Sequence, residues 1–128
     1  MAERDDSTQR LERVVADLRA LSSDIESWAV LDGNGKLLCS SHDEGADRER
    51  VTAILVALSG IADRSARQSG RELASQLRVK TDLGHLLLVR LDGGGTLAAT
   101  TGPKARVGLV LYDMKNARGA VEKAMGEG

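Results

Sequence analysis

Between Asp47 and Ser69 the chain carries apolar residues on two opposite sides of a predicted helix. At ~100° per residue, the first stripe consists of Val51, Ile54, Leu55, Leu58, Ile61 and Ala62. The stripe behind it is built mainly from small residues: Ala53, Val56, Ala57 and Gly60. One face can be buried inside a small domain, whereas the other needs a partner. Because small residues let a second helix approach closely, a copy of the same helix is the expected partner.

The rest of the pattern predicts two more helices and five strands. Apolar residues at helical spacing indicate a first helix over residues 7–22 and a last helix from Val107 almost to the end of the chain. Strands are predicted at residues 28–32, 36–41, 73–80, 85–91 and 96–101. The first two strands are joined by an Asp-Gly-Asn-Gly turn and the last two by an Asp-Gly-Gly-Gly turn, which favours hairpins.

This order predicts an α+β fold in which a five-stranded antiparallel sheet carries helices on both faces. Residues 73–80 alternate between apolar and polar side chains, which suits an edge strand, whereas residues 85–91 are apolar on both faces and suit a covered strand. We expect residues 1–6 to form a disordered N-terminal arm and residues 7–128 to form a single domain.

Composition and charge exclude several classes of partner. The 128 residues are 41% hydrophobic and 29% charged, as in globular domains. Because 18 basic and 19 acidic residues leave a net charge of −1, no overall field attracts nucleic acid or a membrane surface. Only 2% of the residues are aromatic, which leaves little for nucleic-acid bases to stack on. We therefore expect no nucleic-acid partner.

The sequence also predicts a cytoplasmic protein without membrane insertion. Its first residues are charged and polar, unlike a signal peptide, and no apolar run approaches the ~20 residues of a membrane helix. The single cysteine, Cys39, rules out an internal disulfide and fits a reducing compartment. We interpret this thiol as buried and inert.

Candidate chemistry is sparse, and we predict neither an enzyme nor a cofactor. The glycines at 93–95 are followed by a strand and by no Lys-Ser or Lys-Thr pair, so we interpret them as a hairpin turn and not as a phosphate loop. His42 is expected in a solvated loop and His85 at the start of a strand, and their surroundings lack metal-ligand spacing. No pattern indicates a nucleophile, an acid/base pair or a metal site.

The element order and two segments resemble the Roadblock family of dynein light chains and small-GTPase regulators, in its bacterial form. The segments are Ala29-Val30-Leu31-Asp32-Gly33-Asn34-Gly35-Lys36-Leu37-Leu38-Cys39-Ser40-Ser41 and Val107-Gly108-Leu109-Val110-Leu111-Tyr112-Asp113-Met114. The resemblance extends from Leu11 to about Met125. It implies a homodimer in which the third strands pair across a two-fold axis and the middle helices lie side by side.

The resemblance also implies a Ras-like small GTPase as partner, with a sensor kinase assembly as a further one. The expected dimer interface consists of Ala53, Val56, Ala57, Gly60, Leu73, Ser75, Leu77 and Val79. The expected partner-binding residues are Asp63, Arg64, Arg67 and Gln68. On this view the chain is at most a GTPase-activating partner without its own catalytic site. Two alternatives stay open: a structural adaptor without nucleotide involvement, and a small-molecule sensor domain.

Overall fold

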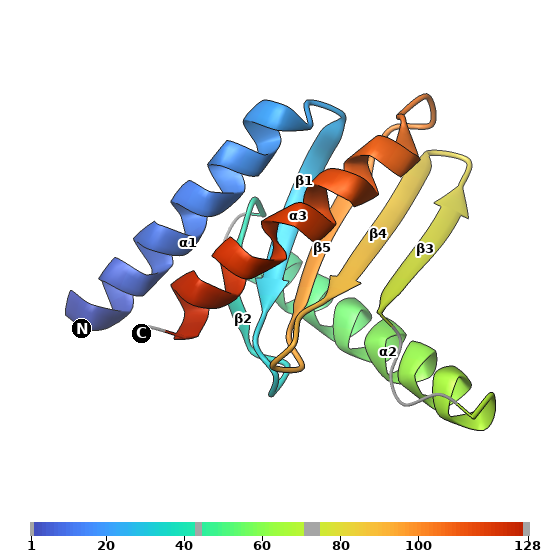
Figure 1. The fold of residues 1–128 in the computed structure, drawn as a ribbon, viewed down its shortest axis with the longest axis horizontal. Coiled ribbons are helices and arrows are strands. Elements are labelled where there is room, and N and C mark those ends of the chain that lie inside the picture. The colour runs from blue at the N-terminus through green and yellow to red at the C-terminus, as the bar shows by residue number, and fades with distance from the viewer. Residues whose placement is uncertain (1, 43–44, 71–74, 127–128) are drawn as a thin grey trace.

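The computed structural model of the protein describes residues 2–42, 45–70 and 75–126. Within these ranges the chain forms three helices and a five-stranded sheet (Figure 1). The elements are α1 (Ala2–Leu21), β1 (Ile25–Leu31), β2 (Leu37–Ser40), α2 (Ala46–Gln68), β3 (Gln76–Thr81), β4 (Gly84–Arg90), β5 (Thr96–Thr101) and α3 (Val107–Gly126). Their order confirms the predicted α+β fold.

Neighbouring strands are antiparallel throughout the sheet, which has the order β2-β1-β5-β4-β3. The central strands β1 and β5 pair from Ile25 opposite Thr101 to Leu31 opposite Thr96. β3 lies at one edge, as its alternating pattern predicts, and the doubly apolar β4 lies between β5 and β3. The outer backbone groups of β3 therefore have no strand partner among the described residues.

Helices cover both faces of the sheet and create two cores. In Figure 1, α1 and α3 lie in front of the sheet and α2 crosses behind it. The front core is the larger and contains Leu11, Val15, Leu18, Val110, Met114 and Val121 of the helices. Because side chains alternate along a strand, Leu87 and Val89 of β4 join the front core while Leu88 joins the rear core around Leu55 of α2.

Local side-chain chemistry explains the first hairpin. The Asp32 carboxylate accepts hydrogen bonds from the backbone N–H groups of Asn34 at 2.9 Å and Lys36 at 3.0 Å. Gly35 has a φ of 82°, a conformation that favours glycine. The predicted turn between residues 32 and 35 is thus confirmed, and it places β2 beside β1.

The structure moves the predicted starts of α1 and β1. α1 begins at Ala2, five residues before the predicted start at Ser7, so the segment expected as an arm continues the helix. It contains no glycine or proline that would stop a helix. β1 begins at Ile25, earlier than the predicted Trp28, because Ile25 already pairs with Thr101 of β5.

Candidate functional site

The outer side of α2 is the first component of the candidate site. Among residues 47–68 of this helix, only Leu55 is fully buried, with 2% of its surface exposed. Ile54 and Ile61 are 48% and 52% exposed, although the sequence pattern assigns them to the buried stripe. That assignment is wrong because the buried stripe is centred on Leu55, and both isoleucines lie on its flank.

The solvent-facing side of α2 is consequently more apolar than the sequence pattern predicts. Its exposed apolar residues and glycine are the predicted stripe of Ala53, Val56, Ala57 and Gly60 together with Ile54 and Ile61. Contiguous exposed apolar surface of this kind marks interaction sites in soluble proteins.

The edge strand β3 adjoins this surface. Leu77 and Val79 pair with Leu88 and Leu86, so their side chains point to the α2 side of the sheet, where Leu77 and Leu58 contact the rear core. The open backbone edge therefore carries apolar side chains next to α2. Ser75, another expected interface residue, is exposed just before β3, whereas Leu73 lies outside the described residues.

Arg90, the last residue of β4, links this strand to α2 through an ion pair with Asp63. Its Nη1 donates to both carboxylate oxygens of Asp63 at 2.9 Å, and Nη2 and Nε donate to the carbonyl oxygens of Gly94 at 3.2 Å and Gly95 at 3.4 Å. The two side chains are only 14% and 15% exposed. Asp63 thus points towards the sheet, which corrects its expected outward position.

The other expected partner-binding residues do lie on the surface. Arg64, Arg67 and Gln68 are exposed near the C-terminal end of α2. The helix ends where Gly70 adopts a φ of 81° and donates its N–H to the Arg67 carbonyl at 3.0 Å. Their exposure makes these three side chains accessible to a partner.

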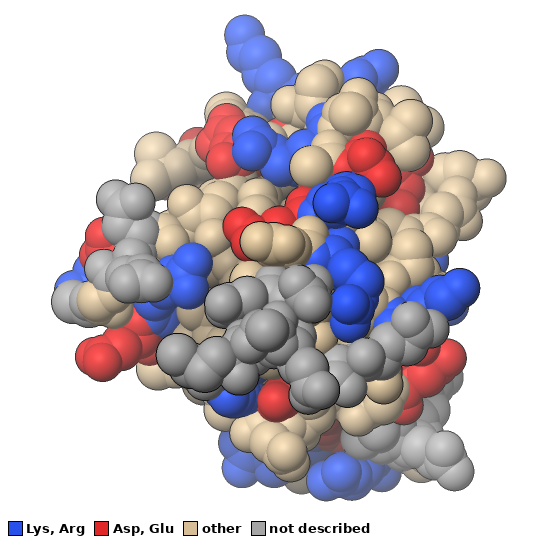
Figure 2. Space-filling model, turned by 90° about the vertical axis from the view of Figure 1, so that its left-hand side faces the viewer, with Lys and Arg blue, Asp and Glu red and all other residues tan. Residues whose placement is uncertain are grey.

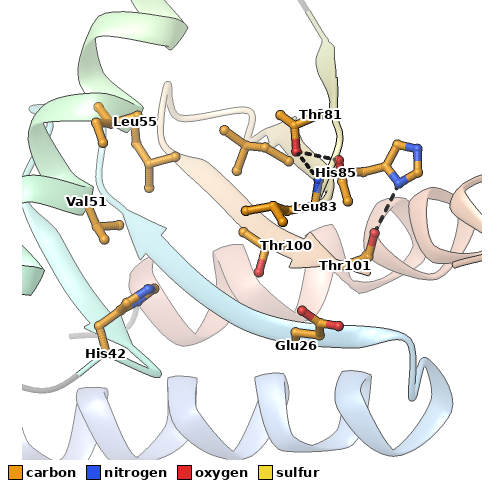
Figure 3. Close-up of a pocket in the computed structure, with 12 residues that line it drawn as sticks. Glu26, His42, Val51, Leu55, Thr81, Leu83, His85, Thr100 and Thr101 are labelled. Carbon is orange, nitrogen blue, oxygen red and sulfur yellow. Dashed lines mark hydrogen bonds between the residues drawn. The ribbon is translucent and has the colours of Figure 1, made fainter. Parts of the chain in front are cut away.

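An apolar pocket of about 390 Å³ lies on the α2 side of the sheet, near the turn between β3 and β4 (Figure 3). Val51, Ile54 and Leu55 of α2 line it, together with Leu83 of the turn, whose side chain is 87% exposed. The turn is held by Thr81, whose hydroxyl accepts from the Leu83 N–H at 3.2 Å and donates to the Gly84 carbonyl at 3.0 Å. The sequence pattern missed this pocket because Leu83 is a single apolar residue in a turn.

The histidines and the cysteine are held by their surroundings. His42 is half-buried and its Nδ1 lies 2.9 Å from the Ser40 hydroxyl, which corrects the expectation of a solvated loop residue. His85 is the second residue of β4, which begins one residue before the predicted start, and its ring is turned away from the pocket towards Thr101 (Figure 3). Cys39 is buried as predicted, and burial raises the pKa of its thiol to about 12.

The described part of the chain holds no group of three or more His, Cys, Asp or Glu residues that could bind a metal ion. None of its helices is long and apolar enough to cross a membrane. Figure 2 shows the side of the molecule at the left of Figure 1, where Lys and Arg side chains are interspersed with Asp and Glu.

Comparison with known proteins decides the family. No protein-family model matches the sequence. The uncharacterized protein MJ0310 of Methanocaldococcus jannaschii is 30% identical over 115 residues, which cover 90% of this chain and 98% of that protein. The chain belongs to one family with MJ0310. MJ1340 of the same organism is also 30% identical, over 84% of this chain and 92% of its own length.

Solved structures identify the fold. MglB of Myxococcus xanthus matches with a TM-score of 0.80 at 15% identity, over 93% of this chain and 90% of its own. A Roadblock/LC7 domain from Streptomyces avermitilis matches with a TM-score of 0.75 at 17% identity, over 86% and 92%. The chain has the Roadblock/LC7 fold. A structure described as MglB with tetrameric arrangement has a TM-score of 0.82 at 13% identity, over 94% and 91%.

This Roadblock/LC7 fold confirms the predicted family resemblance, and the site residues can be placed on it. Leu58 of α2 and Leu77 of the edge strand β3 both pack against the rear core, and the dimer interface expected beside them stays a prediction. The Asp63 side chain is paired with Arg90, whereas Arg64 and Arg67 are exposed.

Proposed function

We propose that this protein is a homodimer that binds a Ras-like small GTPase and regulates or scaffolds its GTPase cycle, without a catalytic site of its own. The observation that carries the proposal is the exposed apolar side of α2 next to the open edge of β3. The Roadblock/LC7 fold supports it, because that family includes small-GTPase regulators and MglB has the same fold.

In the proposed dimer, the β3 strands pair across a two-fold axis and the two α2 helices lie side by side. The interface consists of Ala53, Val56, Ala57, Gly60, Leu73, Ser75, Leu77 and Val79, with Ile54 and Ile61 at its border. Such pairing would satisfy the open backbone edge and remove apolar surface on the order of the ~1,600 Å² of a standard interface. The side-chain Oε1 of Gln76 on β3 is buried without a hydrogen-bond partner among the described residues, which also favours an edge completed by other protein groups.

The dimer is tested by placing a charge on the helix contact. Ala57→Glu should convert the dimer to monomer or aggregate in light scattering, because an unpaired carboxylate would be buried between the helices. Ala20→Glu, at an exposed position of α1, is the matched control and should leave the mass unchanged. An intact dimer in the Ala57→Glu variant would place the interface elsewhere.

The GTPase is proposed to dock on the platform formed by the paired α2 helices, against Arg64, Arg67 and Gln68. Exposed charges on such a surface mainly steer encounter and set specificity. Arg64→Glu with Arg67→Glu should therefore abolish capture of a GTP-binding small GTPase from native cytosol without changing the dimer. Arg13→Glu with Arg19→Glu on exposed positions of α1 provides the matched control.

Capture is measured with GTP and with GDP present, and the retained protein is identified by its binding of labelled GTP. Retention that changes with the nucleotide supports regulation, and equal retention supports a scaffold. If no GTP-binding protein is retained, the adaptor without nucleotide involvement replaces the proposal. We also propose that the protein is cytoplasmic and that a sensor kinase assembly is a further partner.

The pocket beside α2 keeps one alternative open, that of a small-molecule sensor. Its volume of about 390 Å³ is in the range of ligand sites, and its walls are mainly apolar. The sensor alternative is tested by a thermal-shift screen, in which apolar metabolites are added to the protein and, separately, to its Leu83→Ala variant. A ligand that stabilises the protein and depends on Leu83 would favour the sensor.

A further inference from the structure

The two faces of β3 differ in chemistry. Leu77 and Val79 point to the α2 side, so Arg78 and Lys80 point to the side that carries α1 and α3. Both basic side chains are exposed, and β3 contains no acidic residue. In Figure 1, α3 lies over the neighbouring strands and β3 lies beyond it, uncovered on this side.

One flank of α3 adds basic groups beside β3. Leu111, Lys115 and Arg118 follow at intervals of four and three residues and therefore share one stripe of the helix. Leu111 is buried in the front core together with Leu87, the residue that pairs with Arg78. One helical turn further along this stripe, Glu122 accepts the Asp92 N–H at 3.1 Å just after β4, so this part of the stripe is turned towards the end of β4.

The acidic groups near this stripe do not balance its positive charge. Glu122 is engaged with the backbone of Asp92, and Asp82 lies in the exposed turn beyond Lys80. Lys115 is exposed and Arg118 is half-buried at the edge of the helix. The whole chain has a net charge of −1, but basic side chains are concentrated on β3 and on this flank of α3.

The proposed dimer, on which this inference rests, concentrates these cations further. In an antiparallel pair, residues directly opposite each other point to the same face of the sheet. A pairing of two β3 strands that keeps Leu77 and Val79 on the α2 side and is centred on Arg78 or Val79 therefore places Arg78 opposite Arg78 or Lys80 of the second copy. Like charges at such positions destabilise a strand pair.

We propose that the dimer forms a basic trough, with Arg78 and Lys80 of both protomers as its floor and Lys115 and Arg118 along its α3 walls, and that this trough binds an acidic peptide segment. Because a helix with its side chains is about 10 Å thick, a flat membrane surface would contact α1 and α3 before reaching the floor. An extended peptide is narrow enough to lie between the two α3 helices, and its carboxylates would relieve the repulsion between the floor cations.

The test uses the full-length protein and a fluorescein-labelled oligoglutamate peptide, followed by anisotropy at low and high salt. We expect one peptide per dimer and an affinity that falls as salt rises. Arg78→Gln with Lys80→Gln should weaken peptide binding by roughly tenfold or more, because it removes charge from both protomers. Arg13→Gln with Arg19→Gln on α1 is the matched control and should change the affinity by less than about twofold.

A second readout separates the trough from the interface itself. Sedimentation should show that Arg78→Gln with Lys80→Gln makes the dimer tighter at low salt and less dependent on salt, since the repulsion is removed. Damage to an interface would weaken the dimer instead. If the protein is a dimer but does not bind the peptide, the proposed trough is wrong and the proposed dimer stands. If the protein is a monomer at all concentrations, the proposed dimer itself is wrong.

Two further results would reject the acidic peptide as ligand. One is a loss of peptide affinity in the α1 control that equals the loss in the Arg78→Gln with Lys80→Gln variant. The other is binding of phosphatidylserine vesicles or of an oligonucleotide that depends on Arg78 and Lys80 and is tighter than binding of the peptide.

Discussion

Replacing Arg90 with methionine should destabilise the fold strongly, because this residue is the anchor between α2 and the sheet. The substitution keeps much of the side-chain volume but removes both bonds to the Asp63 carboxylate and those to the carbonyls of Gly94 and Gly95. The Asp63 carboxylate would then lose its Arg90 partner in a site where its side chain is only 15% exposed. Breaking one side of a buried ion pair costs roughly 3–5 kcal/mol.

We place the loss for Arg90→Met at the lower end of that range, about 3 kcal/mol, because each side chain retains some contact with water. Urea denaturation followed by circular dichroism, at one fixed protein concentration, measures it. With an m-value of roughly 1.5–2 kcal/mol per molar urea, the midpoint should fall by about 1.5–2 M.

The double variant Arg90→Met with Asp63→Leu provides the control. It removes both charges, so it should recover at least half of the loss seen in Arg90→Met. If Arg90→Met and Asp63→Leu each cost less than about 1 kcal/mol, the pair behaves like an exposed salt bridge. The account of α2 as a helix anchored by this ion pair would then be refuted.

Three further predictions address single groups. Cys39 should react with a thiol reagent at pH 8 much more slowly in the folded protein than in urea, since burial raises its pKa to about 12; equal rates would contradict that burial. The hydrogen bond from the backbone N–H of Arg106 lowers the pKa of Asp24 in the folded protein. The contribution of this contact to the free energy of unfolding is therefore fully present above the ordinary aspartate pKa and is lost as the pH falls through the lowered pKa of the folded state. Carbon-detected NMR titration should find the lowered pKa in Arg106→Ala as well, because that variant keeps the N–H; a return to the ordinary value would assign the effect to the side chain. Calorimetry with GTP should show no saturable heat, since the glycines at 93–95 form a hairpin turn, and micromolar binding would overturn this interpretation.

The sequence predicts the elements of this fold well because their signals are local. The turn at Asp32 to Gly35 carries its own capping carboxylate, and β4 and β3 differ in their alternation, which indicates a covered strand and an edge strand. Hairpins and helices of this kind depend on neighbours within a few residues. Their order in the sheet depends on pairs such as Trp28 with Ala99, which no local pattern contains.

The candidate site was harder to predict because it depends on orientation. Helical spacing shows that Ile54 shares a stripe with Leu55, but the rotation of α2 against the sheet leaves Leu55 buried and Ile54 half exposed. The partner of Asp63 is Arg90, 27 residues further along the chain, and nothing near Asp63 in the sequence indicates it. Exposed Leu83 stands alone in a turn, so it has no periodicity to detect.

The central position of β5 has a consequence for folding during synthesis. β1, near the N-terminus, pairs with a strand that ends at Thr101, so the ribosome has made most of the chain before β1 gains its second neighbour. Until then the side of β1 that faces β5 is an open edge of the β1–β2 hairpin, and Leu97 is missing from the front core. Such sequence-distant pairing slows folding and exposes intermediates to aggregation. A nascent chain stopped before residue 96 should therefore need a chaperone. A chain that includes β5 can pair β1 with β5 and should no longer need one.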